Sequence, residues 1–262
     1  MEFLLKLKNI EVRREGKVLI HNINWEMKPG ENWAILGRNG AGKSTLLQVI
    51  TGYKSPFYGG SIYYFGKEER FFNVWDIREK IGYISYEFEG EYRYNEMGID
   101  VALSGFYSSI GLYEVPDEKK KDEAMEWFLK FKIEHLAKKK IKEMSQGERQ
   151  KVFLIRALVH KPLVLILDEP FVGLDIPSKE GLLEIVDEIG NTKTSLILTT
   201  HSPEEIMPSI THILYLKAGT IFSFGKKEDM LKDELFSKVF DCTVKLVKKD
   251  GRYRVGEVNL NK

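Results

Sequence analysis

The sequence is poor in cysteine, and this scarcity excludes an intrachain disulfide. Cys242 is the only cysteine among 262 residues, which fits a reducing compartment. A dominant charge is also missing, because 40 basic and 39 acidic residues leave a net charge of +1. Such a balanced chain has no overall attraction to nucleic acid or to an anionic membrane surface, so we expect no direct nucleic-acid partner.

Long hydrophobic runs are absent as well. The longest apolar run covers residues 163–167, far below the roughly 18 residues that a membrane-spanning helix needs. Residues 1–8 are too short and too interrupted by charge for a signal peptide, and they fit a first strand better. We therefore expect a cytoplasmic protein without a membrane span, long enough to bury a sizeable core.

The sequence does contain a glycine-rich phosphate-binding loop. A strand-like segment, residues 33–36, precedes the loop, and a helix-like segment, residues 46–50, follows it. Glycines let successive backbone N–H groups point at phosphate oxygens, and the helix start adds positive potential. The pattern predicts that Lys43 reaches the β- and γ-phosphates of a nucleoside triphosphate and that Ser44 ligates Mg²⁺. A glycine-rich turn that merely caps a helix is the less favoured interpretation. The loop residues are Gly37, Arg38, Asn39, Gly40, Ala41, Gly42, Lys43, Ser44 and Thr45.

Two carboxylates follow the apolar run at residues 163–167. Asp168 and Glu169 stand where a buried strand ends, and ligand sites in parallel sheets lie at the carboxyl ends of strands. We expect Asp168 to hold Mg²⁺ through a water. Glu169 is expected to polarise the water that attacks the γ-phosphate. Taken alone, an Asp-Glu-Pro sequence is also common as a helix cap or turn.

A third motif opens a helix over residues 145–158. Ser145 is a good N-cap, and Glu148 three residues later completes a capping box. A capped helix start that contains a glycine, here Gly147, is also an anion site. The structural and the phosphate-binding interpretations are therefore compatible.

The order of predicted elements indicates a parallel α/β sheet. Strand patterns cover residues 3–12, 17–27, 32–36, 61–65 and 81–85, and later 163–167 and 195–199. Helical spacing marks residues 87–137, and an amphipathic segment at 182–189 separates the last two strands. Alternating runs over residues 243–255, joined at Asp250-Gly251, predict a C-terminal hairpin.

Taken in order, the motifs resemble the nucleotide-binding subunit of an ATP-binding cassette (ABC) transporter. They are the phosphate loop, the helix start at Ser145, the Leu-Asp-Glu-Pro run, Gly173-Leu174-Asp175, and His201 after a strand. The resemblance implies a P-loop NTPase (RecA-like) α/β core with an N-terminal antiparallel β subdomain and an inserted α-helical subdomain at about residues 87–150. It places the ATP-binding domain at residues 1–225 and a C-terminal extension with the β-hairpin at 226–262.

The resemblance also implies roles for individual residues. Ser145 and Gly147 would touch the γ-phosphate held by a partner's phosphate loop, and Asp175 would lie at the dimer seam. His201 would contact the γ-phosphate and hold Glu169 and the water in place. The implied cofactors are ATP and Mg²⁺. The implied partners are a second cassette, expected as a homodimer, and separate transmembrane permease subunits that would hold the chain on the inner face of the membrane.

The chain departs from the family pattern at three places. Gln146 and Glu148 replace a glycine and a glutamine of the usual Leu-Ser-Gly-Gly-Gln. Tyr86-Glu87 stand where the family has a glutamine that links Mg²⁺ to the helical region. The carboxylate of Glu87 fits either a contact with the metal or a solvated loop. The aromatic residue that stacks on adenine is missing near Arg13 and Arg14, although a guanidinium can also stack on a base.

The resemblance favours an ATPase subunit that powers transport through separate membrane subunits. Residues 103–113 lie in the helical insertion and resemble the corresponding segment of cassettes associated with molybdate uptake or photorepair. Their aromatics fit either a membrane-partner interface or the core of the insertion. The alternative function is an ABC-type ATPase switch without a membrane partner, in DNA repair or stress. A P-loop kinase would lack the Ser145 motif, and Glu169 with His201 opposes an inactive binding module.

Overall fold

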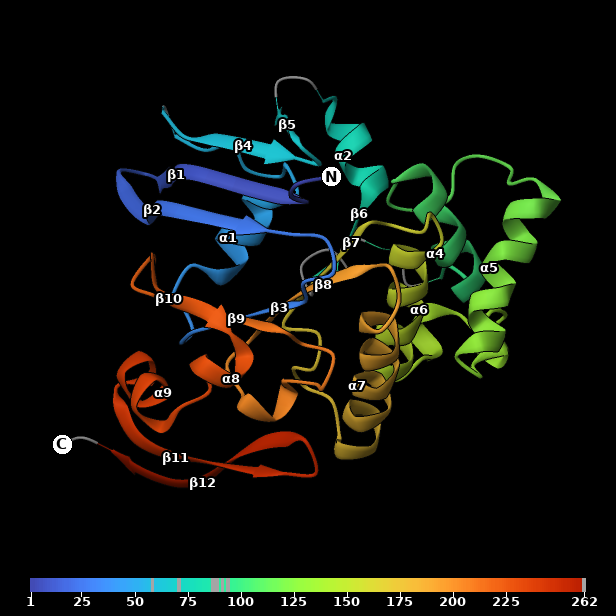
Figure 1. The fold of residues 1–262 in the computed structure, drawn as a ribbon. Helices are drawn as coiled ribbons and strands as arrows, with labels where there is room; N and C mark the ends of the chain where they lie inside the picture. Colours follow the sequence, from blue (N-terminus) through green and yellow to red (C-terminus); the bar gives the residue numbers. More distant parts are fainter. Residues whose placement is uncertain (58, 70–71, 86–89, 91, 93–94, 261–262) are drawn as a thin grey trace.

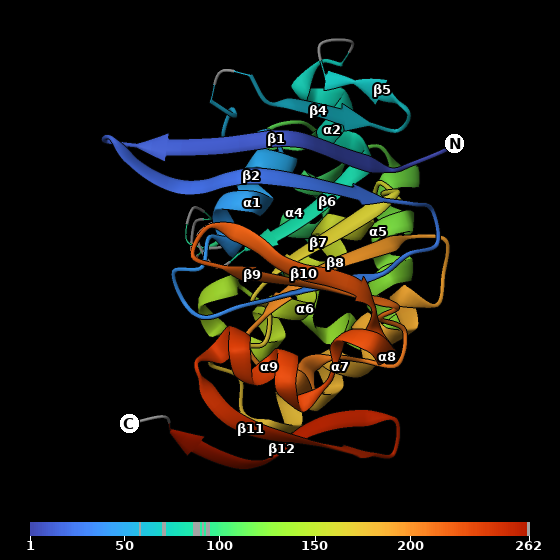
Figure 2. The ribbon, with the colours of Figure 1, turned by 60° about the vertical axis from the view of Figure 1, so that its left-hand side comes forward.

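A six-stranded mixed sheet crosses the centre of the structure (Figures 1 and 2). The computed structural model describes residues 1–57, 59–69, 72–85, 90, 92 and 95–260. The strand order is β10-β9-β3-β8-β7-β6. All neighbours are parallel except β10, which pairs antiparallel with β9. The strands are β3 (Trp33–Leu36), β6 (Ile81–Ser85), β7 (Val164–Asp168), β8 (Ser195–Thr200), β9 (His212–Lys217) and β10 (Thr220–Lys226).

A second, antiparallel sheet lies above one face of the central sheet (Figure 1). Its order is β2-β1-β4-β5, which confirms the predicted N-terminal β subdomain. The α1 helix (Lys43–Ile50) packs between the two sheets, because its apolar side chains join one buried cluster with both. The strands are β1 (Leu5–Arg14), β2 (Lys17–Met27), β4 (Ser61–Tyr64) and β5 (Lys67–Glu68).

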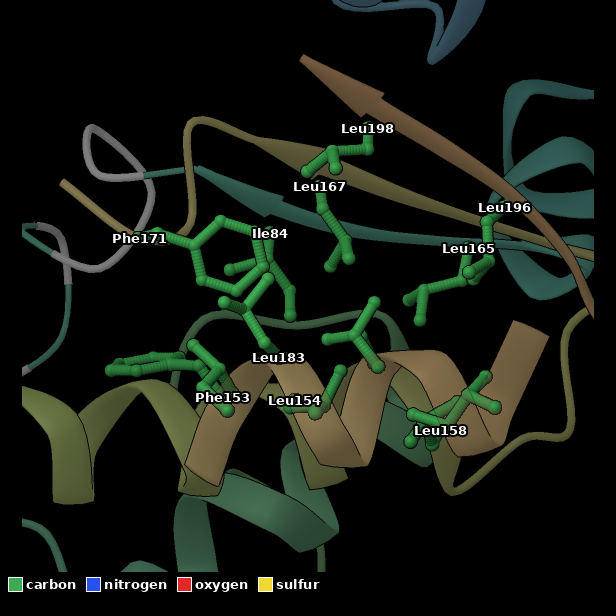
Figure 3. Close-up of a cluster of buried hydrophobic side chains, with 14 of the residues drawn as sticks. Ile84, Phe153, Leu154, Leu158, Leu165, Leu167, Phe171, Leu183, Leu196 and Leu198 are labelled. Atoms are coloured by element: carbon green, nitrogen blue, oxygen red, sulfur yellow. The ribbon is translucent and has the colours of Figure 1, made fainter. Parts of the chain in front are cut away.

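Helices α6 (Gln146–Leu158) and α7 (Ile176–Gly190) cover the other face of the central sheet. Figure 3 shows leucines of β7 and β8, among them Leu167 and Leu198, directed toward these helices. Side chains alternate along a strand, so Ile166 and Ile197 belong to the cluster on the α1 side. Asp168 and Thr199 follow them by two positions and therefore also face α1.

Helical structure dominates the segment between β6 and α6. It contains α4 (Gly98–Ser104), α5 (Glu118–Lys130) and short 3₁₀ turns, as the spacing of apolar residues predicted. The Asp117 side chain accepts a hydrogen bond from Lys120 N and so starts α5. The aromatic residues at 103–113 were expected either in the core of the insertion or at an interface. Phe106 packs against the core, whereas Tyr113 is 77% exposed. A further helix, α2 (Val74–Lys80), precedes β6.

The C-terminal part consists of α8 (Lys227–Met230), α9 (Asp233–Phe240) and a hairpin of β11 (Cys242–Lys249) and β12 (Arg252–Leu260). The hairpin confirms the prediction from Asp250-Gly251. Both turn residues have positive φ, +52° and +77°, as the tight turns that suit twisted strands require. The hairpin lies at the edge of the molecule farthest from the β1-β2 sheet (Figure 2). The division of the chain near residue 225 stays a prediction.

Candidate active site

The phosphate loop joins β3 to α1 and packs too tightly for side chains at two of its glycines, Gly37 and Gly42. Gly42 has φ +104°, and a Cβ added there would lie 2.5 Å from Cγ2 of Ile20. A Cβ on Gly37 would lie 2.3 Å from the carbonyl oxygen of Leu216. The loop is thus clamped between β2 and β9. Close approach of neighbouring atoms requires a glycine at both positions, and at Gly42 the backbone conformation requires one as well.

Lys43 is buried at the first position of α1, and its ammonium group lies against the loop. Nζ donates hydrogen bonds to the carbonyl oxygens of Gly37 (2.9 Å) and Arg38 (3.3 Å). It also forms an ion pair of 3.0 Å with Oε1 of Glu169. The cation expected to grip phosphates and the carboxylate expected to polarise the attacking water therefore meet at one point.

Asp168 lies at the end of β7, on the side that faces α1. Burial raises the pKa of its carboxyl above the ordinary value, while hydrogen bonds from Thr199 and Ser44 lower it. A hydroxyl and a carboxylate thus converge, and these are oxygen ligands of the kind that Mg²⁺ prefers. The described residues hold no group of three or more acidic, histidine or cysteine side chains that would bind a metal alone. The pair fits Mg²⁺, which is usually bound by one or two protein groups together with phosphates.

Glu169 follows with backbone geometry that is uncommon for a side-chain-bearing residue. Its φ is +49°, a left-handed conformation that costs energy outside glycine and persists where the surroundings fix it. Its backbone N–H donates to Oγ1 of Thr199 at 2.9 Å. The carboxylate borders a hollow of about 380 Å³. The described residues that line it are Leu19, Asn39, Gly40, Gly42, Lys43, Ser44, Thr45 and Glu169.

His201 directly follows β8, at the same sheet edge as the loop and Glu169, because β8 lies between β3 and β7. Its side chain is exposed. The segment behind it is anchored: the buried hydroxyl of Thr200 donates to Glu205, which forms an ion pair of 2.6 Å with Lys179 of α7. Ser202 N also donates to this hydroxyl at 2.9 Å. This anchor was not predicted from the sequence.

Ser145 forms the predicted capping box at the start of α6. Its Oγ accepts from Glu148 N (3.2 Å), and the Glu148 carboxylate accepts from Ser145 N (2.7 Å). Lys139 binds the same carboxylate at 2.8 Å. Gly147 allows α7 to approach, since a Cβ there would lie 2.7 Å from Cβ of Ser178. Neither Ser145 nor Gly147 is among the described residues that line the hollow beside Lys43.

The remaining residues with expected roles are not among the described residues that line the hollow beside Lys43. Asp175 caps α7 by accepting from Ser178 N at 2.8 Å. The guanidinium of Arg13 lies 4.6 Å from the centre of the Phe57 ring. An arginine and an aromatic ring therefore stack near the position where the family has the aromatic residue that contacts adenine. The interpretation placed on Tyr86 and Glu87 lies outside the described residues.

The central sheet, the clamped glycine loop and the paired carboxylates define a P-loop nucleotide-binding protein. The chain belongs to the ABC transporter family, whose model matches residues 20–172. It is an ABC transporter ATP-binding protein and an ATPase. Among the described residues, no helix combines the length and apolarity needed to cross a bilayer.

Similarities to individual proteins support this family assignment. The chain is 35% identical over 246 residues to the uncharacterized ABC transporter ATP-binding protein YlmA of Bacillus subtilis (strain 168), covering 92% of each protein. It is 34% identical over 222 residues to the ABC transporter ATP-binding protein ModF of Escherichia coli (strain K12), covering 83% of this chain and 45% of ModF. The solved dimeric structure of a post-hydrolysis state of the ATP-binding cassette MJ0796, bound to ADP and Pi, superposes with a TM-score of 0.72 at 24% identity, covering 85% of this chain and 98% of that one.

Proposed function

We propose that two copies of this chain close head to tail, so that Ser145 and Gly147 of one copy face the phosphate loop of the other. The observation that supports this arrangement is the separation of the motifs: the hollow beside Lys43 lacks the capped start of α6 among its described lining residues. ABC ATP-binding proteins work as dimers with transmembrane partner subunits. The start of α6 carries the positive end of a helix dipole, which suits it to complete the site of a second copy.

In this dimer, the chain's own groups bind and orient the triphosphate. The backbone N–H groups of the loop and the ammonium of Lys43 hold the phosphates. The carboxylate of Glu169 polarises the attacking water, and His201 holds both Glu169 and this water in place. Ser44 and Asp168 would hold Mg²⁺, which supplies charge stabilisation at the transferred phosphoryl group.

The hydrolysis cycle is proposed to power transport through separate permease subunits, which would hold the chain at the inner face of the membrane. The helical segment at residues 103–113, with Tyr113 exposed, is the proposed docking face. Isolation of the chain from membranes, followed by identification of the bound proteins, tests this partner. Recovery of a multi-span protein supports transport, and recovery of DNA-repair or stress proteins alone would favour a switch without a permease.

Two variants test the roles of Lys43 and Glu169. Lys43→Ala should abolish ATP binding, because it removes the cation of the loop. Glu169→Gln should bind ATP but turn over about 10²- to 10⁴-fold more slowly, as expected for loss of a general base. Calorimetry measures binding, and phosphate release measures turnover. Glu126→Gln, an exchange on the surface of α5, is the matched control and should turn over normally. Near-normal turnover by Glu169→Gln would remove this residue from the mechanism.

A further inference from the structure

One buried hydroxyl joins the two carboxylate residues of the site. Thr199, at the end of β8, is 0% exposed. Its Oγ1 donates to Oδ1 of Asp168 at 2.6 Å and accepts from the backbone N–H of Glu169 at 2.9 Å. A hydroxyl carries one proton and two acceptor sites. Since an amide N–H can only donate, the hydroxyl proton is committed to Asp168.

We propose that Thr199 is a positioning residue for ATP hydrolysis, which sets the metal-binding carboxylate of Asp168 and the water-polarising carboxylate of Glu169 relative to each other. The inference rests on the proposed roles of these two residues. In this proposed role, Thr199 contacts neither the nucleotide nor the attacking water. It acts through the orientation of Asp168 and through the backbone of Glu169.

The sheet register explains why this position can do so. Asp168 and Thr199 are direct partners in the parallel pairing of β7 and β8, and both side chains face α1, which begins with Lys43 and Ser44. The next residue, Glu169, leaves the strand with φ +49°. The bond from its N–H to Thr199 helps to hold that conformation, and with it the direction of the carboxylate toward Lys43.

Loss of the hydroxyl leaves both groups without this partner. In Thr199→Val the side chain keeps its β-branched shape, so β8 and its packing are retained. Oδ1 of Asp168 and the N–H of Glu169 then lose a buried hydrogen bond. Removal of a group that hydrogen-bonds to a metal ligand and so orients it typically lowers metal affinity or activity by about 10- to 100-fold. A residue that only stabilised the sheet would not alter kcat in the folded protein.

The experiment compares Thr199→Val and Thr199→Ser with the wild type. Thr199→Val should lower kcat about 10- to 100-fold. Thr199→Ser keeps the hydroxyl and should restore kcat to within about threefold of the wild type. Calorimetry with ATP gives a readout independent of turnover: affinity measured in EDTA should be unchanged, while the gain in affinity on adding Mg²⁺ should shrink.

Thr51→Val is the matched control. Thr51 is also buried, and its hydroxyl donates to the backbone oxygen of Leu47 at 2.8 Å, away from the carboxylates. Its kcat should equal that of the wild type. If Thr199→Val does not fold, Thr199→Ser and Thr199→Ala, which differ only by the hydroxyl, make the same comparison.

A kcat for Thr199→Val within about twofold of the wild type, or equal values for the serine and alanine variants, would overturn the inference. That result would leave the proposed function standing as long as Glu169→Gln is slow. Fast turnover by Glu169→Gln would instead refute the proposed catalytic role itself.

Discussion

Two glycines of the phosphate loop, Gly42 and Gly40, differ in the space that their neighbours leave for a side chain. Gly42 combines φ +104° with a contact of 2.5 Å between an added Cβ and Ile20. Gly40, in the same loop, has φ +78°, but nothing lies within 4 Å of an added Cβ. The two positions therefore separate the cost of a left-handed backbone from the cost of a clash.

Gly42→Ala should lower the free energy of unfolding by more than Gly40→Ala does. The backbone alone costs about 1–2 kcal/mol for a left-handed alanine, and overpacking against Ile20 adds about 1–3 kcal/mol. Urea unfolding of both variants measures the difference. Equal losses in the two variants would show that β2 yields to the added methyl group and that the loop is not clamped.

The phosphate loop and the carboxylates could be predicted from sequence because each is a contiguous run with a mechanism attached. Thr199 and the Thr200–Glu205–Lys179 anchor could not be predicted in this way. Their partners stand 31 residues apart for Thr199 and Asp168 and 26 apart for Lys179 and Glu205, so only the register of the sheet and the packing of α7 bring them together.

At the scale of elements, α6 starts with a cap that also serves the proposed phosphate contact. Ser145 accepts from Glu148 N at 3.2 Å. Ser145→Ala should lower the free energy of unfolding by about 1 kcal/mol, the usual worth of an N-cap. Ser145→Asp keeps a cap and should retain stability, while its charge repels the γ-phosphate and lowers turnover.

Thermal or urea unfolding, together with phosphate release, distinguishes these two consequences. If Ser145→Asp hydrolyses ATP at the wild-type rate, Ser145 has no contact with phosphate and the capping box is its whole role. If Ser145→Ala is as stable as the wild type, water replaces the cap and the helix start is secured by Lys139 and Glu148.

Elements with strong local patterns were predicted well, and those held by tertiary contacts were not. The strands predicted at residues 81–85 and 163–167 are found at 81–85 and 164–168. The short α8 and α9 were missed. Neither helix has a side-chain cap, and Lys227 of α8 is fixed by donating to the carbonyl oxygen of Pro208 at 2.8 Å. The start of α2 did carry a signal, the capping box of Asn73 and Asp76.

At the scale of the whole molecule, stability should fall in mild acid because of one histidine whose ring nitrogens are buried. His160 lies beyond α6 in a cavity also lined by Arg78 and Arg156. Neither ring nitrogen has a partner among the described residues. Burial, and then the charge of Arg156, lower its pKa from 6.5 to about 4. Between these values the unfolded chain binds a proton that the folded protein does not, so stability declines as the pH falls.

His160→Phe removes this titration while keeping an aromatic ring. From pH 7 to pH 5 the wild type should lose about 2 kcal/mol more free energy of unfolding than the variant, at 1.36 kcal/mol per pKa unit. Urea unfolding at both pH values measures the two losses. Parallel losses in the two proteins would mean that His160 takes up a proton as readily in the folded state as in the unfolded state.

The C-terminal extension is linked to the nucleotide site in the folded chain. Asp241 at the end of α9 forms ion pairs with Arg38 of the phosphate loop (3.0 Å) and with Lys217 of β9 (2.6 Å). Hydrogen bonds from Lys217 and Arg38 lower the pKa of Asp241. All three side chains are at least one third exposed, so the pairs are weak in energy and serve mainly to place α9 beside the loop.

The mass of the Glu169→Gln protein in sedimentation velocity with ATP and Mg²⁺ tests the proposed head-to-tail dimer. That dimer requires a species of twice the 30.4 kDa chain mass that needs ATP, and a monomer when Ser145→Asp is added, although the double variant still binds ATP. A Glu169→Gln protein that binds ATP yet remains a monomer would contradict it, as would a dimer that forms equally well with Ser145→Asp.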